Sequence, residues 1–562
     1  MPNLRWLLIS LLLPNLGLIF YAALGYQMGG LRQALDFGGR WASFSILYWI
    51  PIGWILNSAG KASQRWIASF SVSLAAFCAC LWIVYPMAGS RFSPSSARAW
   101  GSYAVGALAF FLIVASLAWL AARPGWISNS LLAIAVVSFI GGIAGPVSLA
   151  RNTDRYLWPK RESPSLNLVN CRLIKLPSGE MVAGKNLHIE NGRIVGIADS
   201  ATDTSSWPKL DAAGGFVMPG LIDVHTHLDT PMRAILEPFD FEYLLDAEYS
   251  LMADHRRAYL QSGVTTVRDL GGPSMHTYAW RRAVADHRLL GPRIFAVGRL
   301  VTSPDGHPVS TIWAAYPYLG REGAILAVDA AGLRQGLDRN EAEGPSDAVK
   351  VIFGTIGRAP GKLSPALVQE AIRWADEKRK VSIVHVETAE EVGVAANSRA
   401  TGIEHVASAG ELPLGLIEQL AKQRTFVDPT FGEYSTVLAL NHTSESERKR
   451  AMATSYGVAR KMAEAGVRFA MGTDAPLVTY GKGFLDEMEH FAQAGFANVQ
   501  ILTIATVNNA AFLGQSGFLG CLEAGCSADL IVVDRNPLES LSALRALKMV
   551  LREGVLVHGN QK

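Results

Sequence analysis

The pattern of apolar and polar residues divides the chain into two unlike parts. The first part is strongly apolar, and five of its stretches contain no Asp, Glu, Lys or Arg: residues 6–24, 41–59, 66–90, 99–122 and 124–150. A helix needs roughly 20 apolar residues to cross a hydrocarbon layer of ~30 Å, and each stretch can supply them. The pattern therefore predicts a helical transmembrane region with about five spans over residues 1–150. For a single stretch, a buried core helix stays open, and the first could also be a cleaved signal peptide.

Basic residues around these stretches bear on the orientation in a membrane. One side would carry Arg32, Arg40, Arg91, Arg98, Arg151, Arg155, Lys160 and Arg161, and the other only Arg5, Lys61, Arg65 and Arg123. We expect a multi-pass membrane protein with the lipid bilayer as a partner. Because basic residues favour the cytoplasmic side, their distribution favours a cytoplasmic position of the C-terminal half. The side stays open, because one miscounted span would reverse it.

Alternating apolar and polar residues mark strands at both ends of the second part. Near its start, residues 168–174, 187–190 and 193–195 alternate, and the last two runs are joined by an Asn-Gly hairpin turn. Near its end, residues 528–533, 549–552 and 555–557 show the same strand-like pattern of apolar residues. We predict one small β-sandwich built from residues 165–215 and 516–562, preceded by a linker over residues 151–164.

The middle of the second part alternates short β-branched runs with helical stretches. Eight such runs occur: Leu221–Val224, Val264–Val267, Arg293–Val297, Ala348–Phe353, Val381–Val386, Gly402–Val406, Thr425–Val427 and Arg468–Met471. This number and spacing predict a (β/α)₈ TIM barrel over residues 216–515. A doubly wound open sheet is the competing fold, but no Gly-rich dinucleotide motif follows any of the runs.

Overall composition excludes some classes of function. The net charge is only +3, and no block of Lys and Arg occurs beyond the residues near the predicted membrane, so a nucleic-acid partner has little support. The five cysteines lack metal-type spacing, and we interpret all of them as structural or incidental, without a disulfide framework. The predicted spans hold no charged residue that could line a transport path.

Polar residues with metal-binding capacity follow several of the predicted strands. His225 and His227 lie two positions apart at the end of an apolar run, so both rings can reach one ion from the same face. Lys350 interrupts the fourth run, and His385, His405 and Asp474 stand at the ends of the fifth, sixth and eighth. Each residue alone has an ordinary structural explanation. Together, at one end of a barrel, they suit one or two zinc-like ions.

Five motifs together resemble the amidohydrolase superfamily, most closely its imidazolonepropionase-like and prolidase-like members. They are residues 217–227, 263–269, 403–405, 472–474 and a tail from residue 528 to 538. The resemblance covers residues 165–560 and leaves the apolar first part aside. It implies a barrel with two divalent metal ions, expected to be zinc, and hydrolysis of a carbon–nitrogen bond.

The resemblance also implies roles for individual residues. His225 and His227 would hold the more buried ion together with Asp474, and His385 and His405 the more exposed one. Lys350 would bridge the ions as a carbamate (a carboxylated lysine). A hydroxide between the ions would attack the substrate, and Asp474 would move the proton to the departing nitrogen.

Substrate recognition is less clear from the sequence. His307 lies in a loop after the third run, where related enzymes carry a Gly-His loop, and is the best candidate for a substrate contact. Arg268 and Tyr434 are weaker candidates. The substrate would be a dipeptide or another small molecule with an amide or cyclic amide bond, and the oligomeric state stays open.

Three alternatives to this activity remain. A deaminase with one metal ion is disfavoured by Lys350, because a single ion needs no bridge. The barrel could belong to a catalytically inactive membrane sensor or binding protein. A transporter with an appended domain is disfavoured by the absence of charged residues in the predicted spans.

Overall fold

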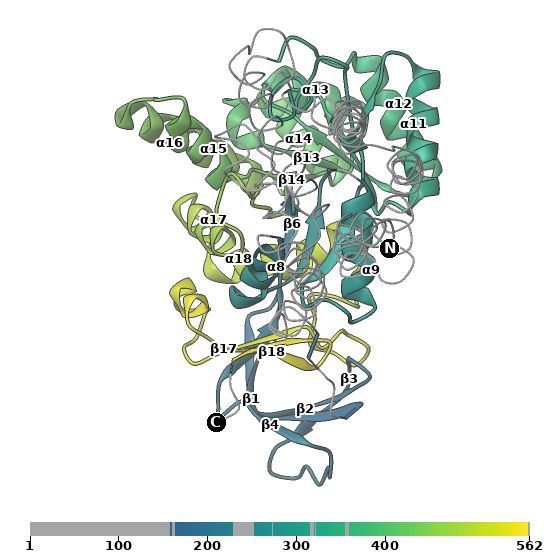
Figure 1. The fold of residues 1–562 in the computed structure, drawn as a ribbon. Coiled ribbons are helices and arrows are strands. Elements are labelled where there is room, and N and C mark those ends of the chain that lie inside the picture. The colour runs from purple at the N-terminus through teal and green to yellow at the C-terminus, as the bar shows by residue number, and fades with distance from the viewer. Residues whose placement is uncertain are drawn as a thin grey trace, which may run out of the picture. The chain divides into compact units, whose positions relative to one another are not determined.

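The protein consists, in its described part, of a β-sheet and a ring of parallel strands covered by helices (Figure 1). The computed structural model describes residues 158–159, 163–228, 252–272, 274–314, 320, 322–354 and 359–559. The sheet and the ring belong to one compact unit.

The predicted transmembrane region requires a correction. Within the described ranges, no helix combines the length and the apolar composition that crossing a bilayer demands. The longest of them, α16 (Glu445–Glu464), has charged residues at both ends. The predicted spans of residues 1–150 lie outside the described residues. The predicted fold class, a transmembrane bundle joined to a barrel and a sandwich, and the predicted multi-pass membrane location are corrected to what the described residues show, which is a barrel with its sheet and no membrane-spanning helix.

Both ends of the second part of the chain contribute strands to the sheet. The early strands are β1 (Ser165–Lys175), β2 (Glu180–Glu190), β3 (Arg193–Asp199), β4 (Lys209–Asp211) and β5 (Phe216–Pro219), and the late ones are β16 (Leu530–Val533), β17 (Leu547–Arg552) and β18 (Val555–Gly559). Their order is β18-β17-β16-β5-β1-β2-β3, with β4 beside β1. Because β5 pairs with β1 on one side and with β16 on the other, the strands form one sheet where a two-layer sandwich was expected. The sequence had placed the residues of β5 in the predicted barrel, which was expected to begin at residue 216, whereas they belong to the sheet.

The ring consists of parallel strands that match the eight β-branched runs. They are β6 (Leu221–Thr226), β7 (Val264–Asp269), β8 (Arg293–Ala296) with β9 (Leu300–Thr302), β11 (Ala348–Ile352), β12 (Val381–His385), β13 (Gly402–Glu404), β14 (Phe426–Asp428) and β15 (Arg468–Phe469), and β10 (Ala324–Leu326) adds to β9. The amide of Val224 donates to the carbonyl of Met471, and Thr226 bridges to Ala475, which closes the ring between its first and last strands.

Helices between the strands cover the outside of the ring. They are α8 (Met252–Gln261), α9 (Ser274–Ala285), α11 (Ala330–Glu343), α12 (Pro365–Glu377), α13 (Ala389–Asn397), α14 (Leu414–Gln423), α15 (Phe431–Leu440), α16, α17 (Lys482–Gln493), α18 (Asn498–Thr503) and α19 (Asn509–Phe512). Three single turns complete the set: η5 (Val406–Ala409), η6 (Ile504–Asn508) and η7 (Leu541–Arg545). Capping residues start several helices. Thr388 and Ser444, for example, each form a capping box with a glutamate three residues later.

Apolar side chains fill the interior of the ring below the carboxyl ends of its strands. Ile222, Val224, Ile383 and Phe426 are buried in one cluster, into which Phe512 of α19 inserts from outside the strands. Since this part of the interior is packed, a site open to a ligand has room at the other end, where the strands finish.

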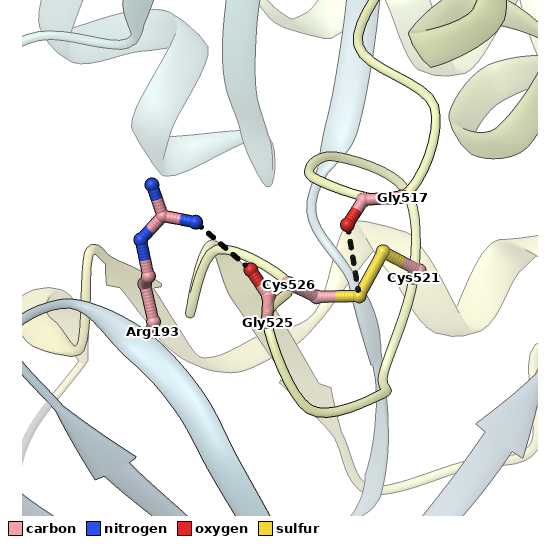
Figure 2. The surroundings of a disulfide bond; sticks show 5 residues. All are labelled: Arg193, Gly517, Cys521, Gly525 and Cys526. Atoms are coloured by element: carbon pink, nitrogen blue, oxygen red, sulfur yellow. Dashed lines mark hydrogen bonds between the residues drawn. A yellow bond between two sulfur atoms is a disulfide. The ribbon is translucent and has the colours of Figure 1, made fainter.

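One structural feature was not expected from the sequence, namely a disulfide between Cys521 and Cys526 (Figure 2). The Cα atoms of these two residues are 5.9 Å apart. Arg193 of β3 donates a hydrogen bond of 3.1 Å to the carbonyl of Gly525, so the loop closed by the disulfide is tied to the sheet. From the sequence, all five cysteines were interpreted as structural or incidental, and their spacing did not single out this pair.

Candidate metal centre

The structure brings together all six residues that the sequence suggests as metal ligands. They come from five strands of the ring and lie at or just after the strand ends, apart from Lys350, which lies within β11. Five of the six residues are almost fully buried: His225, Lys350, His385, His405 and Asp474. The side chain of His227 is partly exposed.

Strand β6 and the turn after β15 hold each other in place. The amides of Thr473 and Asp474 donate hydrogen bonds of 3.1 and 2.8 Å to the carbonyl of His225. The hydroxyl of Thr473 donates to the carboxylate of Asp223, at 2.7 Å. Asp474 itself adopts a left-handed backbone conformation with φ of 53°. These contacts place a carboxylate beside His225 at the end of β6 and His227 just after it.

Asp474 lies between His225 of β6 and His227, which follows the strand directly. Its Oδ1 atom is 3.3 Å from Nε2 of His225 and 3.2 Å from Nε2 of His227. Burial raises the pKa of Asp474, but the charge of His225 and hydrogen bonds from both rings outweigh it, so the pKa lies well below its usual value. Asp474 is therefore a carboxylate, the form in which it can bind a cation or accept a proton.

Lys350 points its amine into the same site. The Nζ atom lies 3.5 Å from Nε2 of His225, and the residue is 1% exposed. Burial lowers the pKa of Lys350, as expected for a lysine between two valines in an apolar strand. A neutral amine is the form that reacts with carbon dioxide to give a carbamate.

His385 and His405 form the other half of the site. Their ring centroids are 4.1 Å apart, and the ring of His405 is 4.8 Å from that of His225. Burial lowers the pKa of both His385 and His405 well below the usual value. Both rings are therefore neutral, and neutral imidazole is the form that binds a metal ion.

The hydrogen bonds of the histidine rings fit a metal site. In His225, His227 and His405 the Nδ1 atom has a partner, at 2.8, 2.9 and 2.9 Å respectively. These partners leave Nε2 of each ring available to the site. Nε2 of His385 is buried and has no hydrogen-bond partner among the described residues. An outer partner on one ring nitrogen and an unsatisfied second nitrogen are typical of metal-binding histidines.

The three suggested substrate contacts lie in different surroundings. The ring of His307 is 6.3 Å from that of His385, and its Nδ1 lies 2.7 Å from the hydroxyl of Thr311. Burial lowers the pKa of His307 to about 3, so this ring is neutral. Tyr434 lies in the first turn of α15 and is half-buried. The structure thus brings His307 to the site and leaves the contact of Tyr434 with a substrate as a prediction.

Arg268 does not face the open side of the site. It is 1% exposed, its Nε donates to the carbonyl of Val224 at 2.8 Å, and its guanidinium carbon lies 4.0 Å from the centre of the Phe512 ring. These contacts point into the packed interior of the ring. The geometry therefore supports a structural role for Arg268 and not a contact with substrate.

Several polar residues of the site were not singled out from the sequence. Glu404 and Asp428 are buried at the ends of β13 and β14, and Thr430 and Glu433 follow β14. Burial and the charge of Glu404 raise the pKa of Asp428 well above its usual value, so Asp428 is protonated. Burial also opposes ionisation of Glu404, but His225, Lys350 and Arg268 outweigh it and keep its pKa well below the usual value. Glu404 stands in the motif of residues 403–405, and its place directly before a histidine was the available signal.

Comparisons with known proteins agree with this geometry. The sequence model of the Amidohydrolase family matches residues 216–558. A 5-methylthioadenosine/S-adenosylhomocysteine deaminase of Thermococcus onnurineus is 25% identical over 405 residues, which cover 65% of this chain and 86% of the deaminase. An ochratoxinase of Aspergillus niger is 24% identical over 369 residues, which cover 59% of this chain and 73% of the ochratoxinase.

Solved structures share the fold. A Xaa-Pro dipeptidase with methionine bound in its active site superposes with a TM-score of 0.62 at 23% identity, covering 70% of this chain and 100% of the dipeptidase. A molinate hydrolase gives a TM-score of 0.61 at 21% identity, covering 71% of this chain and 95% of the hydrolase.

Proposed function

Because the chain belongs to the amidohydrolase family and is a hydrolase of carbon–nitrogen bonds, we propose that it cleaves an amide bond with the help of two divalent metal ions. The observation that carries this proposal is the convergence of four imidazoles, one carboxylate and a buried lysine at one end of the ring. A donor set rich in imidazole nitrogen favours zinc.

Each ion would have its own histidine pair. His225 and His227, with Asp474 between their Nε2 atoms, would hold one ion, and His385 and His405 would hold the other. Lys350 would join the two as a carbamate. Its neutral amine adds to the carbon of carbon dioxide, a nitrogen–carbon bond forms, and one proton leaves the nitrogen. The carbamate brings two oxygen atoms and a negative charge to the centre of the site.

The residues of the chain then move the protons of the reaction. When bound, the ions supply a water molecule that is nucleophilic at neutral pH and polarise the carbonyl of the substrate. Asp474 takes the proton from the attacking water and delivers it to the nitrogen that departs. The buried position of Asp474 keeps bulk water from competing for this proton.

The substrate would be a dipeptide or another small amide. Support comes from His307, whose Nδ1 accepts a hydrogen bond from Thr311 in the tautomer we propose. The other nitrogen of the ring then carries hydrogen and can donate to an oxygen of the substrate. Relatives named as a Xaa-Pro dipeptidase and an ochratoxinase are consistent with small substrates of this kind.

The test is a substrate screen with the metal-loaded full-length protein. We expect it to bind two zinc ions and to hydrolyse at least one member of a panel of dipeptides, N-acyl amino acids and cyclic amides. Asp474→Asn should lower kcat by about 10²- to 10⁴-fold, the usual contribution of a general acid–base, without loss of circular dichroism signal. Asp376→Asn, on the exposed side of α12, is the control and should keep full turnover. Protein that binds no metal, or full turnover by Asp474→Asn, would contradict the proposal.

A deaminase is the second candidate, because the relative from Thermococcus onnurineus is named as one. Lys350 disfavours it, since a site with one ion needs no bridging group. We therefore expect no ammonia release from 5-methylthioadenosine or S-adenosylhomocysteine in an enzyme-coupled assay. Ammonia release with a metal content of one ion per chain would favour the deaminase instead.

A further inference from the structure

A buried carboxylate lies directly behind one predicted metal ligand. Oε2 of Glu404 is 2.8 Å from Nδ1 of His225, and both side chains are at most 1% exposed. Glu404 is the last residue of β13, on the opposite arc of the ring from β6. The carboxylate thus reaches across the interior to the side of the imidazole that faces away from Asp474.

The backbone after β13 explains why two neighbouring residues contact the same ring. Adjacent side chains of a regular strand point to opposite faces. His405, directly after Glu404, has φ of 65°, so the chain leaves the extended conformation there. The ring of His405 consequently lies 4.8 Å from the ring of His225, while Glu404 holds the Nδ1 atom of that same ring.

Arg268 forms a buried ion pair with the carboxylate of Glu404. One terminal nitrogen of Arg268 is 3.5 Å from Oε1 of Glu404, and its Nε is bonded to the carbonyl of Val224. The guanidinium also stacks on Phe512, which prevents it from swinging away. Because both side chains are buried and paired with each other, the carboxylate of Glu404 has no position in water to turn to.

The carboxylate of Glu404, 2.8 Å from Nδ1, decides where His225 carries its hydrogen. The carboxylate only accepts hydrogen bonds, so Nδ1 must be the donor. Nε2 is then the nitrogen that remains to bind an ion, and it faces Oδ1 of Asp474 at 3.3 Å and Nζ of Lys350 at 3.5 Å. We propose that Glu404, clamped by Arg268, is a positioning residue that fixes this tautomer of His225 and strengthens its hold on a metal ion.

This arrangement distinguishes His225 from the other rings. For His227, the partner of Nδ1 is the backbone carbonyl of Gly271. For His405, it is the hydroxyl of Thr430. An anionic partner makes the imidazole a stronger donor to the metal than a neutral partner does. The ion held by His225 should therefore depend on Glu404, and the ion held by His385 and His405 should not. This inference rests on the two-ion site proposed above.

The experiment measures zinc binding by full-length Glu404→Gln in competition with a fluorescent chelator. We expect one of the two ions to bind about 10- to 100-fold more weakly than in the wild type and the other to bind unchanged. The control is Glu370→Gln on α12. Glu370 is also a buried glutamate paired with arginines, namely Arg334 and Arg373, and its variant should bind both ions like the wild type. If Glu404 had a merely structural role, Glu404→Gln would weaken the binding of both ions together.

A second measurement does not depend on the stability of the variant. Nitrogen-15 NMR of histidine-labelled, metal-free wild-type protein reports which ring nitrogen carries hydrogen, and His225→Gln assigns the signal. We expect hydrogen on Nδ1 of His225. Hydrogen on Nε2 with none on Nδ1, or equal affinity of wild type and Glu404→Gln for both ions, would overturn the inference. Wild-type protein that binds no zinc would instead overturn the proposed function.

Discussion

At the scale of single residues, the site depends on where individual protons reside. Burial keeps His385 and His405 neutral, and the same burial favours the neutral amine of Lys350. Asp474 stays charged only because histidines surround it. Residue types alone do not determine these states, since each follows from neighbours that are distant in the chain.

His255 gives a prediction about acid stability at this scale. Its ring stacks on Tyr480 with 3.7 Å between centroids, and burial lowers the pKa of His255 from 6.5 to about 4. The folded state therefore binds fewer protons than the unfolded state between these values. The stability contributed by the neutral ring is complete above pH 6.5 and is lost as the pH falls through 4.

The variant His255→Phe keeps the stacking and removes the titration. Between pH 7 and pH 4.5, its free energy of unfolding should fall by about 2–3 kcal/mol less than that of the wild type, measured by urea denaturation. His442→Asn, at an exposed histidine, should follow the wild type at both pH values. Identical losses in His255→Phe and the wild type would contradict the assignment.

At the scale of elements, two turns build the site. His405 after β13 and Asp474 after β15 both adopt left-handed backbone conformations, with φ of 65° and 53°. Such conformations are uncommon outside glycine and cost free energy, so the surrounding hydrogen bonds must hold them. For Asp474, this bond is the donation of its amide to the carbonyl of His225.

Gly472 tests how closely the turn after β15 packs on β6. A Cβ atom at this position would lie 2.3 Å from Cβ of His225 and 2.4 Å from Oδ2 of Asp428, so one of the two elements must move. Gly472→Ala should lower the free energy of unfolding by about 3 kcal/mol and weaken zinc binding, as measured by denaturation and chelator competition. Gly393→Ala in α13, with open space around it, should instead stabilise by about 0.5–1 kcal/mol. Equal effects at both glycines would exclude this account.

At the scale of the whole molecule, a buried charge network joins the sheet to the ring. Arg552 of β17 contacts Asp529 at 3.0 Å and Glu553 at 2.7 Å. Glu553 also contacts Arg293 at the start of β8, at 2.8 Å. The network therefore links the sheet made by both ends of the second part to the first half of the ring.

Arg552→Met removes the central, fully buried cation of this network and leaves the partly exposed Arg293 to compensate Asp529 and Glu553. We expect the free energy of unfolding to fall by about 3–5 kcal/mol, and calorimetry should show a broader transition as sheet and ring become less coupled. Arg339→Met, which removes an exposed pair with Glu343 on α11, should cost less than about 1 kcal/mol. A loss at Arg552 no larger than that at Arg339 would show that the network adds little.

Local patterns of the sequence determined a large part of the fold and of the site. The eight β-branched runs each coincide with a strand of the ring, because alternation and β-branching are local properties. The six suggested ligands were visible because each lies at or near the end of such a run, and parallel strands bring their ends to one edge. The same reasoning predicted a transmembrane bundle, which the described helices do not support.

Tertiary structure alone decided the remaining features. The pairing of Glu404 with His225 joins residues 179 positions apart, and no local pattern encodes such a distance. Its place on a strand made Arg268 a candidate for a substrate contact. The structure instead directs its guanidinium into the interior of the ring, where it pairs with Glu404. The disulfide requires the turn that brings Cys521 to Cys526, and spacing alone does not reveal it. Sequence periodicity specifies which face of an element is buried, whereas the partner across the interior exists only once the ring has closed.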